Sequence, residues 1–105
     1  MSNILTGNVG EMGILTVTYD AASQAANDTD EDTVTVSGLK VGDFVSLAAP
    51  AHTDGIGICD CRVTADDTLS ITWVNPTAGA VDRASGSFLL FWARPDATKT
   101  ATGTL

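Results

Sequence analysis

The 105 residues give the chain room for a single domain, since domains cluster at about 100–150 residues. Thirteen acidic side chains face only five Lys and Arg residues, and the formal net charge is -8 at pH 7. Because the basic residues are few and scattered, the composition argues against a surface that binds nucleic acid or anionic lipid.

Residues 1–12 follow no clear hydrophobic period and contain two glycines, which predicts an extended N-terminal arm. The candidate residues of this arm for contact with a partner are Asn3, Ile4, Leu5 and Val9. No basic segment followed by an apolar stretch occurs here, so no secretory signal is expected. The longest apolar run, 88–93, is too short to cross a bilayer, and we expect synthesis and assembly in a cytoplasm.

Short segments with strand patterning follow the arm. Their apolar residues alternate with polar ones, and β-branched and aromatic residues are frequent in them. The predicted strands span residues 13–19, 33–37, 44–49, 56–64, 69–73 and 87–94. Turn-forming residues separate them. The connecting segments are a loop over 20–32 (with a short helix over 21–26 as the alternative), a two-glycine turn over 38–43, a loop over 52–55, a hairpin turn over 65–68 and a loop over 75–86.

This succession predicts an all-β fold, either an antiparallel β-sandwich or a small barrel, jelly-roll-like in character. Residues 13–94 form the single β-domain in this prediction. Residues 95–105, rich in Thr and Ala, are predicted to be a C-terminal tail without a core of its own.

Cys59 and Cys61 are the two cysteines, and they lie on one face of a predicted strand. Strand geometry places their Cα atoms about 6.5–7 Å apart, at the limit for a disulfide. Zinc needs four ligands and only His52 could join them nearby, so no metal site is expected. We predict two free thiols in the core, as suits a reducing compartment.

The last predicted strand departs from alternation, because both of its faces are large and apolar. Its residues are Phe88, Leu89, Leu90, Phe91 and Trp92. A strand of this kind is covered on both sides. We therefore predict it as the candidate self-association strand of a homo-oligomer. Cover by the arm or by a loop is the alternative.

Residues that could carry out catalysis are few. His52, the single histidine, lies in a loop near Asp54, but no Gly-x-Ser-x-Gly elbow accompanies it. The acidic run 28–32 has oxygen ligands at alternate positions, yet Thr33 stands where a calcium-binding EF-hand loop needs glycine. We therefore expect no enzymatic activity, no cofactor and no metal. Ion binding by the acidic run is the lesser alternative to a solvated loop.

Several segments in the middle of the chain resemble a known family. They are TVTVSGLKVGDFV (33–45), GIGI (55–58), RVTADDTL (62–69) and WVNPTAG (73–79). From about residue 32 to 95 the chain is similar to small β-rich virion proteins of tailed bacteriophages, among them capsid decoration, or cement, proteins. The resemblance implies a β-domain with an extended arm that forms a homo-oligomer, with a trimer favoured over a dimer, and clamps adjacent subunits of the major capsid protein. It carries no functional residue across, because no motif defines one.

The expected function is therefore that of a structural virion protein on the outer surface of a phage capsid, where it binds and stabilises the major capsid protein. Acidic residues between 11 and 32 would dock on basic capsid residues or face the solvent. The alternative is a carbohydrate-recognising or host-attachment β-domain of a phage tail or fibre. In that case Trp73, Trp92 or Tyr19 would stack on a sugar, although their places in strands favour the core or an interface.

Overall fold

The computed structural model describes residues 7–96, and in that range the chain is all-β, as predicted, without a helix. Among these residues there is accordingly no helix long and apolar enough to cross a membrane. The strands are β1 (Val9–Tyr19), β2 (Ser23–Gln24), β3 (Asp28–Thr35), β4 (Phe44–Ala48), β5 (Gly57–Ala65), β6 (Thr68–Asn75), β7 (Val81–Asp82) and β8 (Gly86–Pro95).

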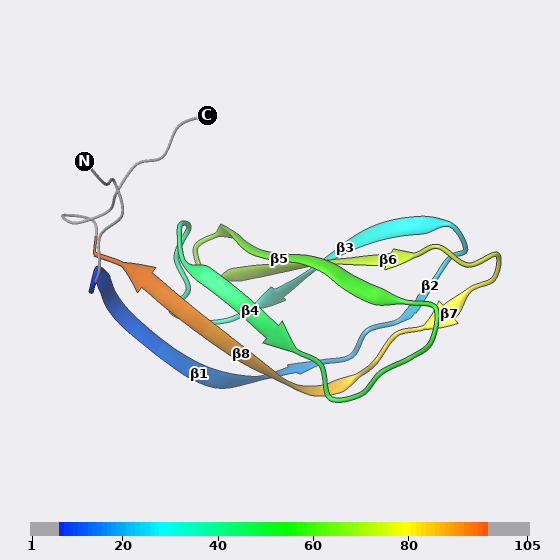
Figure 1. Cartoon of the computed structure of the whole chain (residues 1–105), viewed down its shortest axis with the longest axis horizontal. Helices are drawn as coiled ribbons and strands as arrows, with labels where there is room; N and C mark the ends of the chain where they lie inside the picture. Colours follow the sequence, from blue (N-terminus) through cyan, green and yellow to red (C-terminus); the bar gives the residue numbers. More distant parts are fainter. Residues whose placement is uncertain (1–6, 97–105) are drawn as a thin grey trace.

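The strands form three antiparallel sheets. Two have three strands each, in the orders β1-β8-β4 and β3-β6-β5, and the third is the short pair β2-β7. Figure 1 shows the two larger sheets as two layers, with β2 and β7 side by side at the end of the molecule remote from the start of β1.

One long antiparallel ribbon runs through the whole molecule. It begins where Val9 pairs with Pro95, continues through the β2-β7 pair, and ends where Thr35 pairs with Thr68. The ribbon passes from one layer to the other at β2 and β7, so its two halves belong to different sheets (Figure 1). β4 and β5 then complete the two layers by pairing with β8 and β6.

The hydrophobic core lies between the two layers and takes side chains from both. Its members alternate along the central strands with residues that face outward, which is the two-residue period of a strand. The core residues on the larger strands are Val17, Tyr19, Val45, Val63, Leu69, Ile71, Trp73, Phe88 and Leu90. Burial of each large apolar side chain contributes about 1.5–3 kcal/mol, so this cluster is the main source of stability.

The strands predicted over 44–49, 56–64, 69–73 and 87–94 are confirmed as β4, β5, β6 and β8, with small differences at their ends. The predicted turn between β3 and β4 is confirmed as well. Gly38 and Gly42 adopt φ angles of +97° and +98°, which glycine takes without a steric penalty. Arg94 of β8 fixes this turn by donating two hydrogen bonds to Asp43, at 2.8 and 2.9 Å, and these bonds lower the pKa of the Asp43 carboxyl.

The predicted loop over 20–32 is wrong at two places, because β2 lies within it and residues 28–32 form the start of β3. The predicted loop over 75–86 likewise contains the short strand β7. Aspartate has a low β-propensity, but pairing with β6 supplies the backbone hydrogen bonds that override it. β3 also lies at the edge of its sheet, where charged side chains reach the solvent and are common. No part of residues 21–26 is helical.

β1 begins at Val9, four residues before the predicted start of the strand. Val9 pairs with Pro95, and the last part of the predicted arm thus belongs to the sheet. The other predicted arm contacts, Asn3, Ile4 and Leu5, lie outside the described residues, as does most of the predicted tail.

Candidate interaction surface

The outer face of the β1-β8-β4 sheet is uncharged. Ile14, Phe91 and Ser46 lie in one row across the three strands, and the rows on either side continue the same pattern. We call the following residues the apolar face: Met12, Ile14, Phe44, Leu89, Phe91 and Ala93. The most exposed of them are Ile14 (70%), Phe44 (64%), Met12 (59%) and Leu89 (54%).

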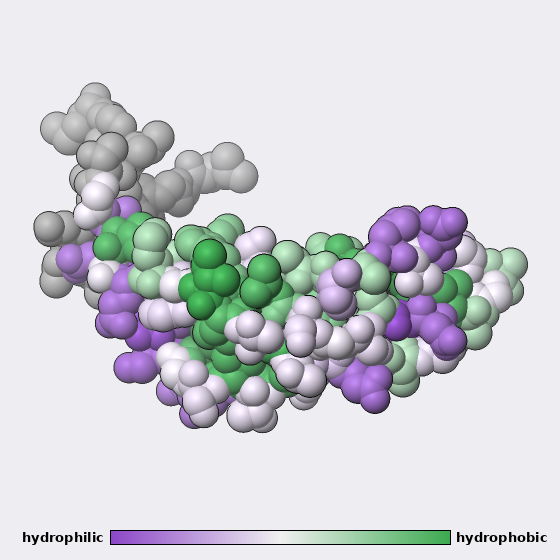
Figure 2. Space-filling model, turned by 90° about the horizontal axis from the view of Figure 1, so that it is seen from below, coloured by the Kyte–Doolittle hydropathy of each residue, from purple (hydrophilic) through white to green (hydrophobic). Residues whose placement is uncertain are grey.

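In the view from below, strongly hydrophobic side chains gather in one patch beside polar surroundings (Figure 2). A shallow hollow of about 250 Å³ lies within the apolar face, between Ile14, Leu89 and Phe91. The exposed parts of the face amount to on the order of 500 Å² of apolar surface, a size that is often functional in a monomer.

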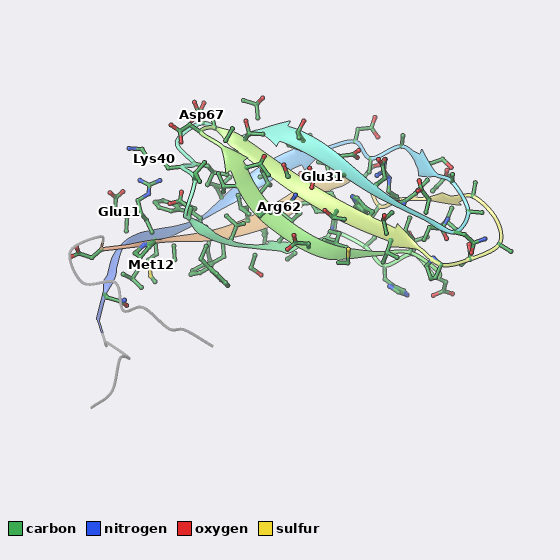
Figure 3. The ribbon with its side chains drawn as sticks, turned by 90° about the horizontal axis from the view of Figure 1, so that it is seen from above. Glu11, Met12, Glu31, Lys40, Arg62 and Asp67 are labelled. Atoms are coloured by element: carbon green, nitrogen blue, oxygen red, sulfur yellow. The ribbon has the colours of Figure 1, made fainter. Side chains whose placement is uncertain are left out.

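The outer face of the β3-β6-β5 sheet has the opposite character. Thr and Ser dominate it, and Arg62 of β5 bridges Glu31 of β3 and Asp60 at 2.6 and 2.9 Å. Glu31 and Arg62 lie beside each other over this sheet in Figure 3. The hydrogen bond with Asp60 is the main cause of the raised pKa of Arg62. The outer face of this sheet is thus polar, whereas that of the β1-β8-β4 sheet is apolar. The apolar face is therefore a local feature and not a consequence of the overall composition.

The structure divides the predicted self-association strand between the two faces of its sheet. β8 is the central strand, paired on both sides, so its backbone has no free edge. Phe88 and Leu90 are fully buried in the core, while Leu89 and Phe91 belong to the apolar face. Trp92 is half-buried against the core, with the Arg94 guanidinium 5.2 Å from its ring centre. Self-association through Leu89 and Phe91 stays a prediction.

A buried polar cluster, which was not predicted from the sequence, closes the core near β2 and β7. Tyr19 donates a hydrogen bond to Asp32 and accepts one of 3.2 Å from the Trp73 indole. Arg83 is almost wholly buried, lies over the Trp73 ring, and donates from Nε to the Ala22 carbonyl at 2.6 Å. Burial, followed by the hydrogen bond with Asp32, raises the pKa of Tyr19 to about 12.

The corner after β6 depends on Asn75, which is fully buried. Its Nδ2 donates to the carbonyls of Gln24, Ala25 and Gly79 at 3.0–3.2 Å, and its Oδ1 accepts from the backbone and hydroxyl of Thr77. One side chain therefore holds together the chain before β3 and the chain after β6. Both this residue and the cluster around Arg83 build the corner of the ribbon.

His52 does not sit in a reactive constellation. Its Nε2 lies 2.9 Å from Asp54, and both side chains are exposed. His52 also borders a pocket of about 230 Å³, whose lining in the described chain includes Leu47, Ile58 and Trp73 but no Ser, Cys or carboxylate. No group of three or more His, Cys, Asp or Glu in residues 7–96 could hold a metal ion.

The aromatic residues considered for sugar stacking offer no exposed ring. Trp73 is 3% exposed and Tyr19 is buried beside it. Trp92 faces the inside of its sheet. A sugar platform needs an accessible aromatic face, so these three residues do not favour carbohydrate recognition.

The prediction that both cysteines lie in the core is wrong for Cys59, which is exposed. The pairing of β5 with β6 shifts between Ile58 and Asp60, so Cys59 is the extra residue of a β-bulge. Because of this bulge, both Ile58 and Cys61 pack against the core. Burial raises the pKa of the Cys61 thiol to about 11, with a further contribution from Asp60.

The two thiols are expected to differ in reactivity. Only the thiolate attacks an alkylating reagent, so at mildly alkaline pH iodoacetamide should modify Cys59 about tenfold faster than Cys61, or more. The measurement is the labelling rate by intact mass in the variants Cys61→Ser and Cys59→Ser, each of which keeps one thiol. Equal rates in the folded variants would contradict the assignment of Cys59 to the bulge, and full denaturation should abolish the difference.

Comparison of the chain with protein-family models, with curated proteins and with solved structures finds no match. What the chain does must therefore follow from its own surfaces, of which the apolar face is the most distinctive.

Proposed function

We propose that this protein is a non-enzymatic structural component of a phage particle, a decoration protein that binds the outside of the capsid through the apolar face. The observation that carries the proposal is this face: a strongly acidic chain leaves one whole sheet surface uncharged, with Ile14, Phe44 and Leu89 more than half exposed. Large exposed apolar surfaces mark sites of protein association. The resemblance of residues 32–95 to phage virion proteins supports the same assignment.

The finer architecture fits the proposal. We propose an antiparallel β-sandwich with jelly-roll connectivity, because a single ribbon formed by the two ends of the chain folds over to give both sheets. Jelly rolls are frequent in viral capsid domains and in lectins.

The partner in this proposal is the major capsid protein, and the two sheets have different roles. With the apolar face on the capsid, the Thr- and Ser-rich sheet with Glu31, Asp60 and Arg62 points to the solvent. A patch on the order of 500 Å² is smaller than the roughly 800 Å² that each partner contributes to a stable interface, so each copy binds modestly. Attachment of one oligomer at several places multiplies such small affinities.

The test uses particles produced by the system that encodes this chain. Purified particles should carry the protein in a fixed ratio to the major capsid protein, as measured by quantitative mass spectrometry. The variant Leu89→Asp should bind to stripped particles at least about tenfold more weakly, because it places a charge in the buried part of the interface.

The matched control is Thr33→Asp, which puts the same charge at an exposed position on the outer face of the other sheet. Circular dichroism should show that both variants are folded. Purified particles that lack the protein would refute the capsid proposal. Equal loss of binding in the two variants would refute the role of the apolar face.

A further inference from the structure

The two larger sheets of the described chain have four edge strands between them. β1 and β4 lie at the two edges of one sheet, and β3 and β5 at the two edges of the other. An unpaired edge presents free backbone N–H and C=O groups, which are a template for pairing with another chain. Proteins that stay monomeric protect such edges by charge, by bulges or by shortness.

Three of the four edges show such protection. β3 carries four carboxylates in its first five residues. β5 has two register shifts and the charged residues Asp60 and Arg62. β4 has only five residues and ends shortly before Pro50.

β1 has none of these features along most of its length. It is the longest strand, with 11 residues, and the segment GILTVTY (13–19) contains no charged residue and no proline. Its pairing with β8 is regular from Glu11 to Tyr19, and the one register shift lies at the beginning, between Val9 and Glu11. Uncharged segments of six or seven residues with high β-propensity are those that pair readily with copies of themselves.

The space beside this edge is open. A groove of about 310 Å³ separates β1 from the segment that ends β3, and it is lined by residues 15–18 and 34–37, all uncharged. β1 forms a ladder with β8 alone among the described strands. Leu15 is only partly buried at the groove, so the edge offers apolar side chains as well as backbone groups.

We propose that β1 pairs antiparallel with β1 of a second copy of this chain, about a two-fold axis that passes midway between the two copies of Thr16. An axis perpendicular to the sheet keeps each residue on its own side of the sheet, so inner residues of one copy must lie opposite inner residues of the other. This requires one residue to lie opposite its own copy, with the axis midway between the two. Thr16 is the centre of the uncharged segment 13–19. With the axis there, the two uncharged segments cover each other completely, and Leu15 of one copy lies opposite Val17 of the other.

The flanking charges explain why a second copy is the matching partner. Glu11 and Asp20 lie on either side of the uncharged segment. In this register Glu11 comes opposite Ala21 and Asp20 opposite Met12, so no like charges meet directly. The remaining negative charge of each copy acts at longer range and is screened by salt. The association is therefore expected to strengthen as the ionic strength rises.

Pairing in this way joins two β1-β8-β4 sheets into one sheet of six strands. The two apolar faces then lie on the same side and form a continuous surface on the order of 1,000 Å², comparable with a standard interface. Of the oligomers that the sequence suggests, the edge thus favours the dimer over the trimer. Only this enlargement of the capsid-binding surface rests on the proposed function; the pairing itself does not.

The test introduces a charge at the axis and measures the association by sedimentation equilibrium. Wild-type protein should be a dimer, and Thr16→Lys and Thr16→Glu should each raise the dissociation constant about tenfold or more, because two like charges then face each other. An equimolar mixture of the two variants should regain dimers, since Lys then faces Glu. Thr16 is exposed, so both variants should keep the circular dichroism of the wild type.

Two controls separate this interface from the others. Thr33→Lys adds a charge to the edge strand β3 and should leave the dimer unchanged. Leu89→Asp should also remain a dimer, although it is expected to lose capsid binding. A monomeric wild type, a Thr16→Lys dimer as tight as the wild type, or a mixture no tighter than its components would overturn the proposal. So would dissociation caused by Leu89→Asp, which would place the contact on the apolar face.

Discussion

The variant Phe88→Ala is expected to lower the free energy of unfolding by about 3–5 kcal/mol. Phe88 is fully buried on the central strand β8, and its ring lies 5.4 Å from that of Tyr19 in a tilted arrangement. Its removal loses the transfer free energy of the ring and leaves a cavity between two layers that cannot close on it. Urea denaturation measures the loss.

The matched control is the next residue of the same strand. Leu89→Ala removes a large apolar side chain that is 54% exposed, so its cost should be well below about 1 kcal/mol. If Phe88→Ala does not fold, Phe88→Leu is the milder substitution, and it should also lower the free energy of unfolding. A similar loss at both positions would contradict the division of β8 into a core side and an outer side.

A second large effect is expected at Arg83, where Arg83→Ala should cost about 3 kcal/mol, the low end for a buried ion pair that loses one partner. The Arg83 side chain is only 4% exposed, and its Nη1 lies 3.0 Å from Asp32 without the alignment of a hydrogen bond. The pair is therefore mainly Coulombic. Loss of the guanidinium leaves Asp32 half-enclosed beside Tyr19 and removes the packing over Trp73.

Arg62 is the control for this prediction. It makes two ion pairs on the open surface, and Arg83 also makes two, with Asp32 and, at 3.6 Å, with Asp30. Arg62→Ala breaks the contacts with Glu31 and Asp60, but solvent screens these charges, and the loss should be far smaller. The double variant Arg83→Met with Asp32→Asn should recover part of the stability, since the one carboxylate that then lacks its arginine, Asp30, is half exposed to solvent. Equal losses for the two arginines in thermal unfolding would contradict the structural role of Arg83.

Local patterning was sufficient for the fold class and for most strands of the chain. Alternation located β6 and β8 well, and the glycines at 38 and 42 marked a turn that the structure confirms. It failed over residues 28–32, because aspartates at an edge strand owe their conformation to pairing with β6 rather than to their own propensity. It failed at Cys59 because a bulge changes the alternation and leaves no mark in the sequence.

The surfaces were harder to predict than the strands. Leu89 and Phe91 were recognisable as excess apolar residues, but Met12, Ile14 and Phe44 become part of the same face only through the register of β1, β8 and β4. That register depends on pairing between residues about 80 positions apart, which no local window contains. The cluster at Arg83 depends on the bend of the ribbon for the same reason. Asp32 lies two residues before Val34, so the two side chains are on the same side of the strand. This placement of a carboxylate was the one signal of the cluster in the sequence.

The ribbon pairs strands that are far apart in the sequence. It therefore also governs the order in which the sheets can form during synthesis. β1 leaves the ribosome before the other described strands, whereas its neighbour β8 leaves after them, although Val9 pairs with Pro95. The hairpin of β5 and β6 can form from adjacent residues, but the sheet containing β1 has to wait until β8 has been synthesised. During that interval both edges of GILTVTY are open, so crowded polysomes are the place where nascent copies of this chain are most exposed to pairing with one another.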